Sequence, residues 1–524
     1  MPGTGEIPES CDYLVIGGGS GGCAAAGRLA AESDASVVVL ESGGTNARED
    51  VIRPNGWFEL LASDANWAYE TVPQAGTADR THIWSMGKVL GGSSAVNGMM
   101  YMRGAPWDYD GWEAEGNPGW DSATVYGVFR DLERYPDGKS DLRGSEGPIK
   151  LITVDGRNPL TSAFLRACEE CGFPRSSDFN GLEPEGFDAQ QLNAWEGRRQ
   201  DAGVIFLDPQ AENRNLTVLL EATAERLVLA PGGDRVSEVV VDHGGEKRSI
   251  AVDAEVILAA GAIASPQLLM LSGIGPAEDL RRLGIEVEVD LPGVGANLHD
   301  HVGVPVAFET NGPYPDSEYQ LVEANLYCRT DPSLSRYDMQ IPFQLFPYVP
   351  PNLEEYGFEH GYTLHPGLMK PRSRGRVSLR SADPAARPLI DPAYLAEEDD
   401  VRDLVKALSI AREIGGSAAF EEWRKREALP GKAVQTPDEL ESYVRSVAGT
   451  YFHPVGTCRM GPGPDCVVGS DLVVHGVENL RVADASIMPE VPSGNTNAPS
   501  MMIGWRAAEF ALLQAPTHGS PVPE

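Results

Sequence analysis

The chain has 524 residues, of which 42% are hydrophobic and 23% are charged, as is ordinary for a folded protein with a sizeable core. Asp and Glu number 77 against 42 Lys and Arg, so the formal net charge is −35. A surface of that charge repels phosphate backbones and anionic lipids, which excludes nucleic acids and membranes as the main partners. No apolar run approaches the roughly 20 residues that span a bilayer.

The N-terminus and the cysteines favour a cytoplasmic location. The first ten residues lack the basic and apolar regions of a signal peptide. The cysteines are scattered, unlike a disulfide framework, and Cys168-x-x-Cys171 has no second pair to complete a zinc site. We therefore expect a cytoplasmic protein with reduced thiols and no bound metal. The sequence indicates no particular oligomeric state.

Residues 12–41 predict a strand, a glycine-rich turn, a helix and a second strand. The apolar runs 12–16 and 37–40 are typical of buried parallel strands, and the Ala-rich residues 23–31 are typical of a helix. Residues 17–22 have the spacing GxGxxG. Together these features predict a dinucleotide-binding site, for either NAD or FAD.

Each residue of this unit has a physical task. Gly17 permits the tight turn, Gly19 lets the backbone approach a pyrophosphate beside Ser20, and Gly22 lets the helix pack close to the strand. Glu41 would accept hydrogen bonds from ribose hydroxyls and repel a 2′-phosphate, which disfavours NADP.

Later segments distinguish FAD from NAD. They are residues 87–104, 261–276, 294–301, 452–457, 482–489 and 494–499. In this order they resemble the signatures of the glucose-methanol-choline (GMC) oxidoreductases, which carry FAD. The resemblance implies an α/β fold with a Rossmann-like FAD-binding domain and a substrate domain built on a mostly antiparallel sheet with helices. The FAD-binding domain is expected over residues 8–155, 200–310 and 445–515, and the substrate domain over residues 156–199 and 311–444.

The resemblance also implies the contacts of the cofactor. The expected contacts are Ser93, Asn97, Gly98 and Met99 along the flavin and ribityl chain, Ala224 at the adenine, and Asp484 and Ala485 near the ribityl chain and pyrophosphate. Several family members attach FAD covalently through a histidine in the first of these segments. Val96 stands at that position here, so we expect non-covalent FAD.

Oxidation of an alcohol needs one group that takes the hydroxyl proton and another that holds the hydroxyl oxygen. His453 precedes Pro454 in a loop, and an imidazole titrates near neutrality. On position alone it could be a buried structural histidine, but the resemblance favours a catalytic base. Asn497 matches a family position that is His or Asn, which predicts a neutral partner for the hydroxyl. It also stands at a helix start.

The remaining histidines carry weaker expectations. His299 and His301 are expected to be structural or peripheral to the flavin, because no third metal ligand accompanies them. His365 is a candidate pocket residue.

The predicted function is oxidation of a primary alcohol to the aldehyde, with hydride transfer to flavin N5. The electron acceptor is either O2 or a quinone. The alternative is a hydroxynitrile-lyase-type enzyme that uses FAD structurally. Choline and aryl, furanic or aliphatic alcohols all stay open, because the sequence assigns neither an aromatic cage nor a pocket carboxylate. Candidate pocket walls are Phe343, Phe346, Tyr348 and Phe452.

Overall fold

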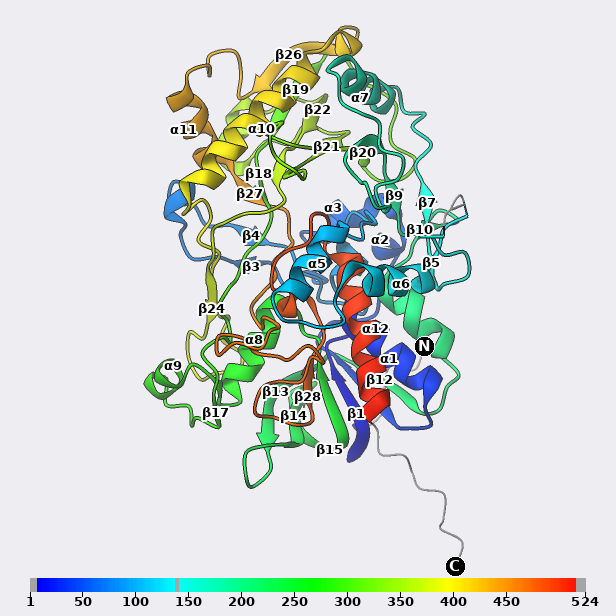
Figure 1. The fold of residues 1–524 in the computed structure, drawn as a ribbon, viewed down its shortest axis with the longest axis vertical. Helices are drawn as coiled ribbons and strands as arrows, with labels where there is room; N and C mark the ends of the chain where they lie inside the picture. The colour runs from blue at the N-terminus through cyan, green and yellow to red at the C-terminus, as the bar shows by residue number, and fades with distance from the viewer. Residues whose placement is uncertain (1–6, 137–140, 515–524) are drawn as a thin grey trace, which may run out of the picture.

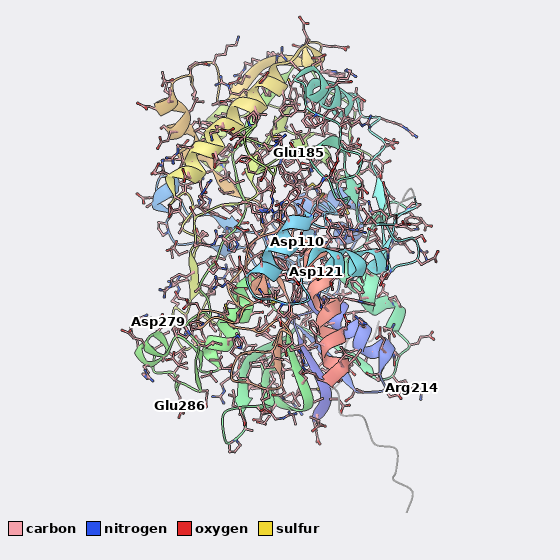
Figure 2. The ribbon with its side chains drawn as sticks, in the orientation of Figure 1. Asp110, Asp121, Glu185, Arg214, Asp279 and Glu286 are labelled. Atoms are coloured by element: carbon pink, nitrogen blue, oxygen red, sulfur yellow. The ribbon has the colours of Figure 1, made fainter. Side chains whose placement is uncertain are left out.

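The computed structural model describes residues 7–136 and 141–514, without the side chains of residues 354–356. Two sheets lie toward opposite ends of the long axis of the molecule, and helices pack on and between them (Figure 1). Among the described residues, no helix is both long enough and apolar enough to cross a membrane. Acidic side chains such as Asp110 and Glu286 project from the surface (Figure 2).

The first sheet has the strand order β12-β2-β1-β15-β14-β13, and β28 pairs with β15. Its strands are β1 (Ser10–Ile16), β2 (Val37–Glu41), β12 (Leu216–Leu220), β13 (Ala222–Leu229), β14 (Val236–His243), β15 (Glu246–Leu258) and β28 (Leu480–Val482). The pairs among β12, β2, β1, β15 and β28 are parallel. Helix α1 (Ser20–Glu32) connects β1 to β2, which confirms the predicted strand–helix–strand unit.

Glycines bring α1 against the sheet and against α12 (Asn497–Gln514), and the two helices run side by side in Figure 1. A Cβ atom on Gly22 would lie 1.9 Å from the carbonyl oxygen of Gly17. A Cβ on Gly504 would lie 1.9 Å from the carbonyl oxygen of Gly21. Only glycine fits at these contacts, so they fix where the N-terminal ends of both helices lie.

The second sheet has the order β26-β19-β22-β21-β23-β18-β27, with β20 on β21 and β8 on β20, and its pairs are antiparallel. Its strands are β8 (Gly186–Ala189), β18 (Val302–Gly303), β19 (Val306–Thr310), β20 (Val322–Cys328), β21 (Met339–Gln344), β22 (Gly361–Leu364), β23 (Gly367–Leu368), β26 (Arg424–Leu429) and β27 (Gly449–Thr450). Helices α7 (Pro159–Glu170) and α10 (Glu398–Gly416) contribute side chains to its apolar core.

Strand pairing differs from the expected boundaries at two places. Residues 302–310 and 449–450 fall within the segments expected for the FAD-binding domain, and they form β18, β19 and β27 of the second sheet. The candidate catalytic loop begins where β27 ends.

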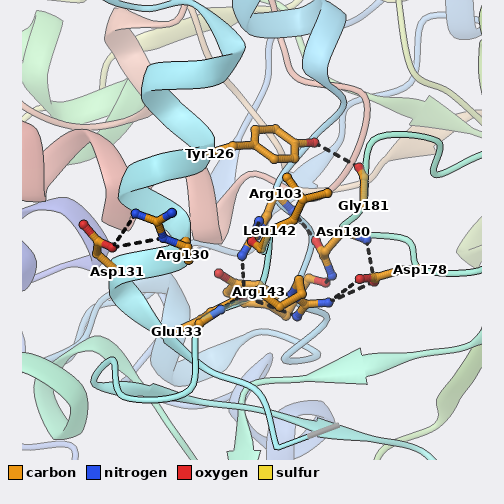
Figure 3. Close-up of polar contacts among 12 residues, drawn as sticks. Arg103, Tyr126, Arg130, Asp131, Glu133, Leu142, Arg143, Asp178, Asn180 and Gly181 are labelled. Atoms are coloured by element: carbon orange, nitrogen blue, oxygen red, sulfur yellow. Dashed lines mark hydrogen bonds and ion pairs between the residues drawn. The ribbon is translucent and has the colours of Figure 1, made fainter. Parts of the chain in front are cut away.

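A buried ionic cluster ties together the segments between the sheets (Figure 3). Glu133 pairs with both Arg103 and Arg143, and Arg143 also pairs with Asp178 at 2.7 Å. The side chains of Glu133 and both arginines are almost completely shielded from solvent. Each buried charge therefore has a partner of opposite sign, as burial requires.

Candidate active site

A cavity of about 900 Å³ lies between the two sheets and takes its walls from both. The predicted site residues that line it are Gly17, Gly19, Ser20, Glu41, Ser93, Asn97, Gly98, Met99, Ala224, His453, Asp484, Ala485 and Asn497. Gly22 lies behind this surface, at the contact between α1 and β1. One continuous cavity therefore brings together residues from distant parts of the chain.

The loop between β1 and α1 has room for a phosphate group. A Cβ on Gly19 would approach only the Cα of Gly92, at 3.9 Å, so the backbone is open on the cavity side. Gly19 caps α1 in an extended conformation, with no side chain bound to the helix end. The N–H groups of the first turn are left for a ligand, and the helix dipole favours an anion there.

Two buried carboxylates hold the loops at this end of the cavity. Glu41 accepts hydrogen bonds from the N–H groups of Gly18 at 3.0 Å and Gly43 at 2.7 Å, and burial raises the pKa of Glu41 to about 7. Asp484 accepts bonds from the N–H of Gly261 at 2.8 Å and the hydroxyl of Ser265 at 2.6 Å. These bonds use only part of each carboxylate's acceptor capacity, so Glu41 can still accept a ribose hydroxyl.

Hydrogen bonds to the carboxylate of Asp300 hold the catalytic loop that follows β27. The N–H of His453 donates to Asp300 Oδ1 at 2.7 Å. The hydroxyls of Thr450, at 2.6 Å, and Tyr394 donate to Oδ2 of the same carboxylate. Burial raises the pKa of Asp300 to about 6. Asp300 therefore positions the His453 backbone, while the imidazole itself points elsewhere.

The imidazole of His453 contacts a second buried histidine. Its Nδ1 lies 2.9 Å from Nδ1 of His301, and Nε2 of His301 lies 3.2 Å from the carbonyl oxygen of Met369. A carbonyl only accepts, so Nε2 of His301 carries the hydrogen. Burial holds the pKa of His301 well below its ordinary value, so the ring is neutral and its Nδ1 is an acceptor.

These contacts fix the tautomer of His453. Its Nδ1 must carry the hydrogen that is donated to His301. Burial lowers the pKa of His453 to about 3, so the ring is neutral and Nε2 carries no hydrogen. Nε2 is the ring nitrogen that contacts Asn495, at 3.1 Å, and both residues line the cavity. The site thus presents an unprotonated nitrogen base.

The carboxamide beside His453 belongs to Asn495, whereas the sequence analysis expected Asn497. Asn495 Nδ2 lies 3.1 Å from His453 Nε2. The Oδ1 of Asn497 instead accepts a hydrogen bond from the Ser20 hydroxyl at 2.8 Å. The reason is the start of α12 at Asn497, which directs this side chain toward α1 and leaves Asn495 in the preceding loop. The buried Oδ1 of Asn495 has no partner among the described atoms.

Sequence reasoning therefore missed two contacts. Asn495 and Asn497 are two residues apart, and only the start of the helix tells them apart. His301 was expected to be structural or peripheral to the flavin, but it bonds directly to the imidazole of His453. Its neighbour His299 is buried, with both ring nitrogens bonded to backbone, at Asn297 and Val491.

The predicted pocket walls separate into two groups. Phe346, Tyr348, His365 and Phe452 line the cavity. Phe343 lies behind the wall, where it stacks on Phe164 with ring centroids 4.8 Å apart. Val96 lines the cavity at the end of α4 (Ser93–Val96) with an apolar side chain.

Family models and known relatives match the chain over nearly its full length. A family model described as "GMC oxidoreductase" matches residues 11–303, and a second model of the same description matches residues 371–504. The chain is 36% identical over 530 residues to an oxygen-dependent choline dehydrogenase of Rhizobium rhizogenes, covering 96% of this chain and 95% of the relative. It is 36% identical to an alcohol dehydrogenase [acceptor] of Pseudomonas putida, with 96% and 95% covered. The crystal structure of pyridoxine 4-oxidase from Mesorbium loti superposes with a TM-score of 0.91 at 34% identity, covering 96% of this chain and 99% of that one.

Proposed function

Because the chain belongs to the GMC oxidoreductase family, whose members bind FAD, we propose that it oxidises a primary alcohol to the aldehyde, with His453 as the base and Asn495 as the partner that positions the hydroxyl. This assignment replaces Asn497 by Asn495 in the catalytic pair. The observation that carries it is the neutral imidazole nitrogen that faces a carboxamide inside the cavity.

Bound FAD supplies the redox chemistry, since its isoalloxazine N5 accepts the hydride from the carbon that bears the hydroxyl. Ser93, Asn97, Gly98 and Met99 would hold the flavin and ribityl chain. The first turn of α1 would bind the pyrophosphate, Glu41 the ribose, and Ala224 the adenine. Val96 has no nucleophile, so this binding is non-covalent.

The substrate hydroxyl would enter between the two side chains. Its oxygen would accept a hydrogen bond from Asn495 Nδ2, and its proton would pass to Nε2 of His453. The Asn495 donor would stabilise the negative charge that develops on the oxygen. The hydrogen bond from His453 to His301 keeps the lone pair on Nε2 throughout.

Anaerobic titration of the yellow holoenzyme with a panel of choline, benzyl, furfuryl and short aliphatic alcohols tests this proposal. We expect at least one alcohol to bleach the flavin and to yield one aldehyde per flavin. A flavin that stays oxidised with every alcohol, together with cleavage of mandelonitrile, would identify a lyase instead. Release of peroxide in air, compared with reduction of a soluble quinone, then distinguishes an oxidase from a dehydrogenase.

A further inference from the structure

The cavity has an arginine that no carboxylate neutralises. Arg80 lines the cavity and is half-buried. Its Nε donates to the carbonyl oxygen of Thr77 at 3.1 Å, and one terminal nitrogen, Nη2, donates to the carbonyl oxygen of Ala448 at 2.5 Å. Among the side chains that the structure describes, which exclude those of residues 354–356, no carboxylate lies within ion-pair distance of Arg80, and Nη1 has no acceptor. A half-buried guanidinium without a counterion is a site for an anion.

Outside residues 354–356, whose side chains are not described, no acidic residue lines the part of the cavity that faces the second sheet. Within the described chain, the acidic residues that line the cavity are Glu41 and Asp484. Both hold backbone loops at the end where the cofactor residues gather. Asp300 lies behind this wall, where the N–H of His453 donates to its carboxylate. A quaternary ammonium group in this part of the cavity would therefore meet no carboxylate on the described lining, even though the protein as a whole is strongly acidic.

Aromatic rings connect the catalytic histidine to Arg80. Tyr451 lies 6.2 Å from the ring of His453 and 5.2 Å from that of His365. The ring of His365 stacks on Tyr348 at 5.3 Å, with an interplanar angle of 25°. The guanidinium of Arg80 lies close enough to Tyr348 to oppose the rise that burial causes in the pKa of this phenol. All five residues line the same cavity. This wall suits a flat ring system, because aromatic faces pack against one another.

We propose that the preferred substrate is an aromatic primary alcohol with a carboxylate at the end opposite to its hydroxymethyl group, and that Arg80 binds this carboxylate. The hydroxymethyl group lies between His453 and Asn495, and the ring packs along Tyr451, His365 and Tyr348. This inference rests on the proposed function and adds the substrate class to it. Arg80 is a specificity-determining residue and takes no part in proton transfer.

The test compares isosteric pairs on the holoenzyme: 4-(hydroxymethyl)benzoate against 4-(hydroxymethyl)benzamide, and the corresponding two-ring biphenyl pair. For at least one ring length, we expect kcat/KM for the carboxylate to exceed that for the amide by about 10- to 100-fold, as a charge-assisted hydrogen bond provides. Arg80→Gln is expected to remove this ratio, because it lowers kcat/KM for the carboxylate far more than kcat/KM for the amide. Arg80→Lys should retain part of the ratio, because it keeps the charge.

Binding without turnover gives a second measurement. Titration with 4-methylbenzoate or 4′-methylbiphenyl-4-carboxylate, followed through the flavin absorbance, should give a Kd at least roughly tenfold lower in the wild type than in Arg80→Gln. Arg248→Gln removes an exposed charge of the same sign outside the cavity and serves as the control. Equal use of carboxylate and amide at both ring lengths, or a preference for choline, would overturn the inference but leave alcohol oxidation intact. Failure of every alcohol to reduce the flavin would instead reject the proposed function.

Discussion

The reactivity of His453 depends on a side chain that touches neither the substrate nor the cofactor in the proposed arrangement. His301 accepts the Nδ1 hydrogen of His453 and donates its own hydrogen to the Met369 carbonyl. If this bond is lost, the His453 hydrogen can move to Nε2, and the base no longer faces the hydroxyl. His301 is therefore a positioning residue.

His301→Gln and His301→Leu separate this role from simple packing. A glutamine can accept from His453 and donate to the Met369 carbonyl, whereas a leucine can do neither. We expect the rate constant for anaerobic flavin reduction to fall by about 10- to 100-fold in His301→Leu, and the glutamine variant to recover most of the loss. Equal rates in the two variants, with FAD content unchanged, would contradict the tautomer argument.

The low pKa of His453 makes a prediction about pH. Burial lowers this pKa to about 3, so the protonated, inactive imidazole becomes populated only near that pH. Asp300, whose pKa burial raises to about 6, also titrates in this range, so the measurement uses Asp300→Asn. In this variant the rate constant for anaerobic reduction should stay constant from pH 8 to pH 5, and it should decline only in more acidic buffer. A decline centred near pH 6.5, in stopped-flow measurements at saturating alcohol, would show that the bound base titrates like an ordinary histidine.

At the scale of elements, the close contact between α1 and α12 holds the cofactor loop and the catalytic loop together. Gly504→Ala would place a methyl group against the Gly21 carbonyl and force the helices apart. We expect a loss of about 1–3 kcal/mol in the free energy of unfolding, together with weaker FAD retention. Gly127→Ala is the control, because a Cβ at this position in α6 (Ser122–Leu132) meets no atom within 4 Å. The control should melt at or slightly above the wild-type temperature, because Ala favours a helix. Equal melting temperatures for Gly504→Ala and Gly127→Ala would show that the two helices can accommodate the added methyl group.

The secondary-structure elements differ in how far the sequence predicts them. The β1–α1–β2 unit is local, so the glycine spacing and the two apolar runs predicted it from 30 residues. The pairing of residues 302–310 with the second sheet depends on partners far along the chain, such as β22 and β26. Periodicity contains no information about such partners.

The choice of asparagine beside His453 also depends on contacts between distant parts of the chain. Asn497 was the predicted carboxamide, but the side chain that contacts His453 belongs to Asn495, two residues earlier. The choice depends on where α12 begins and on the Ser20 hydroxyl, which comes from the other end of the chain. The contact of His301 with His453 likewise joins segments 152 residues apart.

For the molecule as a whole, charge dominates the solution behaviour. A net charge of −35 makes the surface repel itself, and salt screens that repulsion over a Debye length of about 10 Å at 0.1 M. We expect the melting temperature of the holoenzyme to rise by a few degrees between 10 mM and 300 mM NaCl. Sucrose at equal osmolality is the control for general exclusion effects. A melting temperature that falls or stays constant with salt would mean that specific ion pairs outweigh the net repulsion.

Anaerobic stopped-flow reduction of three purified variant holoenzymes, alongside the wild type, tests most directly whether His453 and Asn495 together activate the hydroxyl. His453→Ala should retain the yellow cofactor but reduce it at least roughly 100-fold more slowly than the wild type. Asn495→Ala should slow reduction by about 10- to 100-fold, and Asn497→Ala should slow it less than Asn495→Ala. Wild-type reduction rates in His453→Ala, or a larger loss in Asn497→Ala than in Asn495→Ala, would contradict the account.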